Sequence, residues 1–441
     1  MASETWREIS IGALCDMGAA QTQTGPFGSQ LHSSDYVVNG VPVIPTEAIR
    51  RRHLVTEGIP QVSKETAERL SRHLLKRGDI LFARRGVQAT GLSAIIKPFH
   101  EGSLCGTGAI LLRILTPEID TEYLSFFLSA EATVSWLRQH AVGAVMPNLN
   151  EGVIRQLAIT LPPLSEQRAI ASVLGALDDK IDLNRRMCQT LEEMARALFK
   201  SWFVDFDPVR AKMEGRDPGL PKEIADLFPS RLVDSELGPI PEGWTASNFG
   251  CIAEARREGV AANQIDAATK YIGLEHMPRR SISLWEWESG DAIESNKSRF
   301  AKGDILFGKL RPYFHKVGVA PIDGVCSTDI IVIQPKNRAA FSAVLGLASS
   351  DDFVAYTDKR SAGTRMPRTN WSDMAAYPVA VPPSAVLSAH DSIIRPLAER
   401  IASAIHEVRL LQALRDTLLP KLIAGEVRVP ASLGSMQEMA S

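Results

Sequence analysis

The sequence predicts an α+β protein in which two similar domains lie at opposite ends of a pair of long antiparallel coiled-coil helices, with internal pseudo-two-fold symmetry. Three observations predict this fold class. The chain repeats itself once, each copy mixes short β-type segments with a helical segment, and each copy ends in a long heptad pattern.

The repeat is carried by three pairs of motifs. GAVMPNLN at 143–150 returns as GTRMPRTN at 363–370, and LPP at 161–163 returns as VPP at 381–383, both at an offset of 220 residues. RGDILF at 77–82 returns as KGDILF at 302–307 at an offset of 225, which one small deletion in the second copy explains. A repeat this large is expected to be a complete domain with its own connector.

The predicted parts follow one another along the chain. They are a first domain at 1–163, a spacer helix at 164–204, a linker at 205–240, a second domain at 241–383, a second spacer helix at 384–424 and a tail at 425–441. The first domain has β-type runs such as VPVI at 41–44 and AILL at 109–112, then a helical pattern from about Glu122 to His140. The linker is rich in Pro and is expected to run along the surface, and the tail after Gly425 to be frayed and dispensable for the fold.

The two spacer helices are expected to pack on each other. Apolar residues from Ile170 to Trp202 alternate in steps of four and three, and the second copy keeps this register except at His390. At about 1.5 Å per residue each helix extends roughly 55 to 60 Å, too long to cover only its own domain, which is the alternative interpretation. Equivalent helices related by a two-fold axis run antiparallel. Asn184 in the seam is expected to fix the register, and Pro396 to bend or fray the first turns of the second helix.

The composition excludes several classes of protein. The 441 residues are 45% hydrophobic and 23% charged, as in ordinary globular chains, and the five cysteines form no C-x-x-C pair that would suggest a disulfide framework or a zinc site. The start of the chain has no secretion signal and no apolar run is long enough to cross a bilayer, so a cytoplasmic protein is expected. Because the net charge is −2, any nucleic-acid surface must be a local basic patch.

Enzyme motifs are weak or missing. GDILFGKL at 303–310 has the spacing of a phosphate-binding loop, but Leu310 stands where a Ser or Thr must bind Mg²⁺, and the first copy has Ala83 and Arg84 where Gly and Lys are required. No glycine-rich cofactor fingerprint, zinc-protease motif or nucleophile elbow is present. We therefore expect a non-catalytic chain without a cofactor or metal.

The motifs together resemble the specificity subunit of type I restriction-modification systems. They are the two GDILF runs, LPPLSEQR at 161–168, LEEMARALFKSWFVDFD at 191–207, IPEGW at 240–244 and LRDTLLPKLIAGE at 414–426. The likeness covers the chain from Trp6 to about Val427, and only the entry to the second helix, SAVL at 384–387, lacks the family's SEQR signature.

The resemblance implies a function and a set of partners. In that family two target-recognition domains alternate with two spacer helices, and each domain reads one half of a bipartite site in double-stranded DNA. The chain would dock two modification (methyltransferase) subunits, which carry S-adenosylmethionine, and these would recruit restriction (translocase and nuclease) subunits that use ATP and Mg²⁺. It would itself be non-catalytic.

Basic residues cluster in each domain and are the candidate DNA contacts. Reading a sequence requires side chains at base edges, whereas phosphate contacts set position. In both copies two cations follow the GDILF run. The candidates are Arg51, Arg52, Arg84 and Arg85 in the first domain, and Arg279, Arg280, Lys309, Arg311, Arg365 and Arg368 in the second. The alternative interpretation is that these are solvated charges at strand ends, while Gly78, Asp79, Gly303 and Asp304 are expected to be turn residues.

Two further expectations concern the target. Because the copies differ throughout their interiors, the two half-sites should differ and the site should not be a palindrome. The competing class is a coiled-coil protein-interaction scaffold whose two domains bind peptides or proteins, which the near-neutral net charge favours.

Overall fold

The chain forms two compact units. The computed structural model describes residues 6–86, 89–143, 147–363 and 365–429. Unit 1 comprises the chain up to residue 179 and from residue 412 on, and unit 2 comprises residues 180–411. Each unit therefore contains one β-rich domain and a part of each of two long helices, α6 (Leu164–Phe203) and α12 (Ser384–Ile423).

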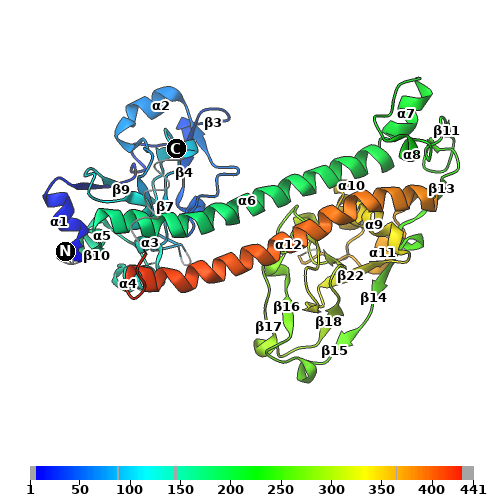
Figure 1. The fold of residues 1–441 in the computed structure, drawn as a ribbon. Coiled ribbons are helices and arrows are strands. Elements are labelled where there is room, and N and C mark those ends of the chain that lie inside the picture. The colour runs from blue at the N-terminus through cyan, green and yellow to red at the C-terminus, as the bar shows by residue number, and fades with distance from the viewer. Residues whose placement is uncertain (1–5, 87–88, 144–146, 364, 430–441) are drawn as a thin grey trace. The chain divides into compact units, whose positions relative to one another are not determined.

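The domain of unit 1 is built on two small sheets (Figure 1). The first has the antiparallel order β2 (Ala20–Thr24), β9 (Ala109–Ile114), β6 (Ile80–Ala83), β7 (Ser93–Ile95). The second has the order β3 (Tyr36–Val37), β5 (Gln61–Val62), β4 (Val41–Ile44), β8 (Leu104–Cys105). A separate pair, β1 (Arg7–Ser10) and β10 (Ala158–Leu161), closes the domain.

Five helices complete the domain. They are α1 (Ile11–Asp16), α2 (Lys64–Arg69), α3 (Thr121–Ser129), α4 (Glu131–His140) and α5 (Glu151–Gln156). The single helical pattern predicted from Glu122 to His140 is two helices, because Ala130 has an extended backbone and ends α3 before α4 begins.

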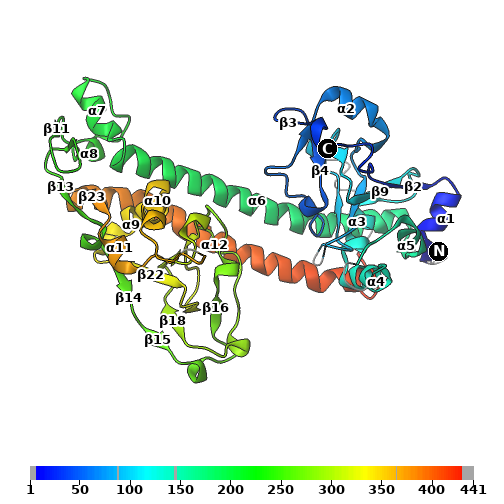
Figure 2. The same cartoon turned by 180° about the vertical axis from the view of Figure 1, so that it is seen from behind.

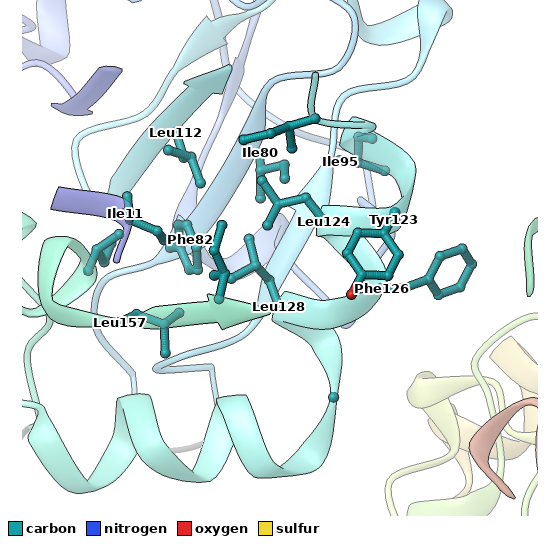
Figure 3. Close-up of a cluster of buried hydrophobic side chains, with 14 of the residues drawn as sticks. Ile11, Ile80, Phe82, Ile95, Leu112, Tyr123, Leu124, Phe126, Leu128 and Leu157 are labelled. Carbon is teal, nitrogen blue, oxygen red and sulfur yellow. The ribbon is translucent and has the colours of Figure 1, made fainter. Parts of the chain in front are cut away.

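The repeated GDILF run supplies the buried strand β6. Ile80 and Phe82 face α3 and pack in one core with Leu124 and Leu128 (Figure 3). Leu81, on the opposite face, belongs to a second cluster, so both faces of the strand are covered. Gly78 and Gly303 have φ of +84° and +91°, which confirms the turns predicted before the two strands.

The domain of unit 2 repeats the first four-stranded sheet and the closing strand pair, and its other sheet is larger. Its four-stranded sheet has the order β14 (Ala253–Arg256), β22 (Ile330–Pro335), β19 (Ile305–Gly308), β20 (Val317–Val319), and β13 (Thr245–Asn248) pairs with β23 (Pro378–Val381). The other sheet has five strands in the order β15 (Gly259–Val260), β18 (Lys297–Phe300), β21 (Gly324–Cys326), β16 (Lys270–Ile272), β17 (Glu288–Ser289). The helices are α9 (Phe341–Ala348), α10 (Asp351–Lys359) and α11 (Trp371–Ala375).

The two long helices pack on each other within each unit, and Figures 1 and 2 show them side by side there. In unit 1, Leu174 of α6 shares an apolar cluster with Leu419 and Leu422 of α12. In unit 2, Cys188 of α6 shares a cluster with Ala404 of α12. Further along α6 in unit 2, Trp202 packs with Val386 near the start of α12, so the two helices run antiparallel there, as predicted.

Two seam residues and one proline of the second helix stand out. Asn184 is 1% exposed, and its Nδ2 has no hydrogen-bond partner among the described residues. His390, where the apolar pattern fails, is buried against the rings of Trp202 and Phe203, and burial lowers its pKa to about 4. Pro396 does not fray the second helix, because α12 is continuous from Ser384.

The linker is more than a surface-running strip. It forms α7 (Asp207–Met213), α8 (Lys222–Ala225) and the strand pair β11 (Leu232–Val233) and β12 (Ile240–Pro241). Phe206 and Phe228 from this segment pack with Trp202 and Trp244 in a small core of their own. Composition did not reveal this because the aromatic residues are widely spaced among Pro and charged residues.

The beginning of the tail is also packed, so residues 425–429 are not frayed as expected, while residues 430–441 of the predicted tail lie outside the described residues. Arg428 forms an ion pair with Glu166 at 2.7 Å and stacks over the ring of Trp6. The Trp6 Nε1–H donates to the same Glu166 at 3.0 Å. The residues from Gly425 to Val429 are thus part of unit 1. Among the described residues no helix is long and apolar enough to cross a membrane.

Candidate nucleic-acid interface

In unit 1 the repeated motifs meet in space. We call residues 84–86, which follow β6, and 147–150 the first loop pair. Leu149 N–H donates to the Arg84 carbonyl at 2.8 Å, and Arg85 pairs with Asn148 in an isolated antiparallel bridge. The Asn150 side chain then caps α5 by accepting from the backbone N–H of Val153. Two motifs more than 60 residues apart therefore form one surface element.

Unit 2 builds the same element from the second copy of the motifs. We call residues 309–311, which follow β19, and 365–370 the second loop pair. Thr369 N–H donates to the Lys309 carbonyl at 3.1 Å, and Leu310 pairs with Arg368 in an isolated antiparallel bridge. Asn370 caps α11 as Asn150 caps α5. The two bridges join equivalent positions of the repeat, so this geometry is common to both domains.

The first loop pair holds Arg84 and Arg85. The half-buried Arg84 donates from Nε to Asn148 Oδ1 at 2.9 Å and to the Leu149 carbonyl at 3.1 Å, which fixes its guanidinium against the loop. Arg85 is exposed. One cation therefore orders the loop and the next is presented to the exterior.

Arg51 and Arg52 lie elsewhere in unit 1. Arg51 is exposed and pairs with Glu131 of α4 at 2.5 Å. Arg52 is only 8% exposed, has φ of +66°, and donates to Asp178 at 2.9 Å and to Glu122 at 3.1 Å while its guanidinium covers the Phe126 ring. Its hydrogen-bonding groups face the interior of the unit rather than solvent.

In unit 2 a basic and aromatic cluster adjoins the second loop pair. Arg279 and Arg311 both stack on Phe314, with their guanidinium carbons 4.1 and 5.9 Å from the ring centroid. Arg280, Arg311 and His315 have φ of +58°, +52° and +50°. Positive φ in non-glycine residues costs about 1 to 3 kcal/mol each and tends to gather at functional sites.

Three further cations belong to the second loop pair. Arg368 pairs with Asp329 at 2.9 Å, and this carboxylate raises the pKa of the Arg368 guanidinium. Lys309 is half-buried and Arg365 is exposed. Within the described part of the chain, neither of these two side chains has a hydrogen-bond or ion-pair partner. Arg280 differs, because its Nη1 pairs with the exposed Asp351 at 2.7 Å.

The structure thus brings together Arg84 with Arg85, and Lys309 and Arg311 with Arg365 and Arg368. Arg51 and Arg52 contact helices instead. Comparison of the two copies of the repeat does not single out Arg257, a further candidate DNA contact. It follows β14 directly and lies beside Lys309 in a surface hollow. The Arg256-Arg257 doublet was visible in the sequence, but the first copy has Gln23 and Thr24 at the equivalent positions of β2, so the repeat did not point to it.

The described residues contain no group of three or more His, Cys, Asp or Glu side chains that could hold a metal ion. Four of the five cysteines are buried or half-buried. Burial raises the pKa of the Cys105, Cys188 and Cys326 thiols. These thiols are packing groups rather than ligands.

Comparison with known proteins identifies similar chains. A family model described as the type I restriction modification DNA specificity domain matches residues 3–193. The specificity subunit of the type I restriction enzyme MjaIX of Methanocaldococcus jannaschii is 24% identical, with 85% of this chain and 83% of the relative covered. The HindI specificity subunit of Haemophilus influenzae is 23% identical, with 96% and 99% covered.

A solved structure has the same fold. The crystal structure of a type I restriction-modification S subunit from M. genitalium superimposes with a TM-score of 0.56 at 14% sequence identity. The match covers 95% of this chain and 96% of that chain.

Proposed function

Because the chain belongs to the specificity subunits of type I restriction-modification systems, we propose that it recognises an asymmetric bipartite site in double-stranded DNA and delivers the catalytic subunits to it. Specificity subunits are the non-catalytic component of these enzymes. One observation carries the proposal. The most strongly repeated motifs of the two copies form the same loop pair in each domain, but the side chains on the two loop pairs differ.

We assign the two target-recognition domains to residues 1–163 and 241–383. The spacer helices are then 164–204 and 384–424, separated by the linker at 205–240 and followed by the tail at 425–441. These boundaries follow the sequence repeat. They differ from the boundaries of the two compact units, because each long helix contributes to both units.

The loop pairs are the proposed DNA-reading elements. Arg85 in the first domain, and Lys309, Arg311 and Arg365 in the second, offer donors close to a rigid hydrogen-bonded backbone, which is what base reading in the major groove requires. Arg279, Arg280 and Arg368 flank them, and Arg51 lies on a separate exposed surface. These four are proposed to contact phosphates, which sets position. Arg84 and Arg52 are proposed to have structural roles, because Arg84 holds the first loop pair together and Arg52 forms ion pairs in the interior of unit 1.

The partners follow from the same proposal. Two modification subunits would bind and methylate adenine with S-adenosylmethionine, and restriction subunits would add ATP- and Mg²⁺-dependent translocation and cleavage. No residue of this chain is assigned to these cofactors. The length of the paired helices would set the number of unread base pairs between the two half-sites.

Methylation-sensitive sequencing tests the proposal. A host that carries this chain with its modification subunits should show one bipartite motif with two unlike halves. Arg85→Ala should lower discrimination at one position of one half-site by about 1 to 3 kcal/mol, or weaken methylation at all sites if Arg85 contacts a phosphate. Lys64→Ala, which removes an exposed cation on α2 far along the chain from the loop pair, is the control.

Two outcomes would contradict the proposal. A palindromic motif would show that the two domains do not read different sequences. The absence of any sequence-specific methylation, together with capture of a protein or peptide by the isolated chain, would favour the interaction scaffold instead.

A further inference from the structure

A hollow of about 390 Å³ opens beside the second loop pair in unit 2. Its walls are the end of β14 with the residues that follow it (255–259), the start of β22, and Lys309 with Thr369, Asn370 and Trp371. The rigid backbone of the loop pair, in which Thr369 N–H donates to the Lys309 carbonyl, forms one side. The hollow therefore lies against the element that the proposed function assigns to DNA reading.

Several hydrogen-bond donors that line the hollow have no partner among the described residues. Thr369 is 2% exposed, and its Oγ1 has no hydrogen-bond partner among the described residues. A buried hydroxyl without a partner is unfavourable by about 1 to 3 kcal/mol, so such groups usually serve a ligand or a water molecule. The Lys309 ammonium and the exposed Arg257 guanidinium likewise have no partner in the described part of the chain.

The one carboxylate at the hollow is already neutralised. Glu258 accepts from Arg256 at 2.6 Å and from Arg299 at 2.6 Å. The hydrogen bond from Arg256 is the largest cause that lowers the Glu258 pKa. With Glu258 engaged by two guanidinium groups, the free charge facing the hollow is positive and belongs to Lys309 and Arg257.

The same place in the first domain is closed by the protein itself. Leu112 and Ile333 are equivalent, because they pair with Ile80 and Ile305 of the repeated strand. Their other strand partners, Thr22 and Ala255, are therefore equivalent too. Two residues further on, Thr24 stands at the position of Arg257. The Glu151 carboxylate, at the repeat position of Trp371, accepts from Thr24 N–H at 2.7 Å and from Thr24 Oγ1 at 2.6 Å.

The third position completes the contrast. Leu149, which is fully buried, stands at the repeat position of Thr369. The first domain thus has a hydroxyl paired with a carboxylate and an apolar side chain where the second has a cation, an aromatic ring and an unpaired hydroxyl. The backbone geometry is shared, and a fourth side chain differs as well: Arg84, at the repeat position of Lys309, donates to Asn148 Oδ1 and the Leu149 carbonyl, whereas Lys309 has no partner among the described residues.

We propose that this hollow is a base-reading subsite of the second domain that selects guanine at one position of the second half-site. Guanine presents two acceptors, O6 and N7, in the major groove, and lysine and hydroxyl donors match them. Lys309 and Thr369 are the reading residues, and Arg257 holds the neighbouring phosphate. The first domain has Leu149 in place of Thr369, and its Arg84 is held by the loop in place of the unpaired Lys309, so the subsite acts on one half-site only. This inference rests on the proposed function.

The test uses the complete methyltransferase complex and a DNA library randomised in both half-sites. Thr369→Val removes the hydroxyl and keeps the shape, and Lys309→Met removes the charge and keeps the length. Each should reduce the preference for guanine at one position of the second half-site by about 10-fold or more, and leave the first half-site unchanged. Thr369→Ser, which keeps the hydroxyl, should retain the preference.

Two further variants separate the roles. Arg257→Met should weaken binding to all sequences and lower the slope of log affinity against log salt by about 1, as expected for one lost phosphate contact. The triple variant Arg257→Thr, Thr369→Leu, Trp371→Glu introduces the side chains of the first domain at these three positions and should abolish the same guanine preference. Thermal unfolding of each variant verifies that the fold is retained.

The outcomes distinguish failure of the guanine subsite from failure of the proposed function. If the wild-type complex reads an asymmetric bipartite site while folded Thr369→Val and Lys309→Met proteins keep every base preference, this inference is wrong and the proposed function stands. A uniform loss of affinity for Lys309→Met without a change in preference would also overturn it. If the wild-type complex reads no sequence, the proposed function fails and this inference fails with it.

Discussion

Asp178 and Arg52 join the first β-rich domain to α6 through a hydrogen bond of 2.9 Å between Asp178 Oδ2 and Arg52 Nε. The other oxygen of the same carboxylate accepts from Arg415 of α12 at 2.8 Å. One side chain therefore connects the domain and both long helices within unit 1. Glu122 and the ring of Phe126 complete the surroundings of Arg52.

In unit 2 the β-rich domain is held to α6 by hydrogen bonds to a buried carboxylate, not by an ion network. The repeat positions of Asp178, Arg415 and Glu122 are Ala398, Ala195 and Ser342, so the ion network has no equivalent there. Glu192 of α6 is instead buried and accepts from the backbone of Ile282 and Ser283, both at 3.1 Å, and from two Ser hydroxyls. A mainly apolar cavity of about 250 Å³, lined in part by Ala195 and Ser342, lies beside this contact.

We expect Arg52→Ala to destabilise unit 1 by about 3 kcal/mol. The change removes one partner of a buried ion pair and leaves the Asp178 and Glu122 carboxylates less well compensated. The shift of the urea unfolding midpoint measures the effect. Arg51→Ala is the matched control, because its side chain is 40% exposed and pairs with an exposed Glu131, so the change should stay within about 1 kcal/mol. Equal effects for the two variants would refute the structural role of Arg52.

Asn184→Leu should stabilise the pairing of the helices by about 1 to 2 kcal/mol. The Asn184 Nδ2 is buried without a hydrogen-bond partner, and an apolar side chain removes that desolvation penalty. Thermal unfolding of the full chain measures the gain. Leu174→Asn, which places an amide at a fully buried seam position, should have the opposite effect. A loss of stability in Asn184→Leu would indicate that the amide has a partner in solution.

Acid should weaken unit 2 through His390. Burial lowers the pKa of this ring from 6.5 to about 4, so between these pH values the unfolded chain binds more protons than the folded one. The free energy of unfolding should therefore fall as the pH falls from about 6.5 towards 4, by at most about 3 kcal/mol from this residue. His390→Gln should lose this contribution in urea titrations at several pH values.

A control isolates the titrating group. Ser342→Ala removes the hydroxyl 2.8 Å from His390 Nδ1 but leaves the buried ring, so its pH dependence should persist. His73 in unit 1, whose pKa is lowered to about 4 mainly by burial, adds a dependence of the same sign that the His390 variant should keep. If the slope is the same in His390→Gln and the wild type, His390 does not titrate as argued.

Removing the residues from Gly425 on should destabilise unit 1 by about 1 to 3 kcal/mol. This truncation deletes the Arg428–Glu166 ion pair and exposes the ring of Trp6. The melting temperature measures the loss. A chain that ends at Val429 keeps all of these contacts and is the matched control. If the shorter chain melts at the wild-type temperature, the tail is dispensable after all.

Lengthening both helices should lengthen the unread spacer if the proposed function is correct. Inserting one heptad after Arg185 in α6 and one after Ile405, its repeat position in α12, adds about 10 Å, close to three base pairs. Sequencing of methylated sites should return the same two half-sites with a longer gap. Insertion in α6 alone should break the pairing of the helices and abolish specific methylation. An unchanged gap in the double insertion would contradict a spacing role for the helices.

Much of the fold could be predicted because its signals repeat at fixed offsets. The heptad pattern predicted α6 and α12, and the GDILF runs predicted the buried strands β6 and β19. The linker and tail were misjudged because their packing depends on single aromatic residues, Phe206, Trp244 and Trp6, which carry no periodicity.

The candidate site was harder to predict than the fold. A basic residue near a strand end looks the same in sequence whether it faces solvent, like Arg85, or a buried carboxylate, like Arg52. The difference depends on Asp178, which is 126 residues away in the chain. Arg257 and Thr369 could not be predicted as site residues from the sequence. Their role becomes clear only when the same place in the first domain is seen to be closed by the Thr24–Glu151 contact.

The different contacts that hold the two domains to the long helices determine where a domain could be exchanged between related chains without loss of those contacts. A crossover in α6 after Asp178 transfers the first domain together with the carboxylate that anchors Arg52. A crossover at the linker would separate Glu192 from the Ser281 and Ser283 hydroxyls, and a second domain without hydroxyls at these positions would leave this buried carboxylate with fewer donors. Inheritance of new second domains should therefore favour exchanges that begin upstream of Glu192.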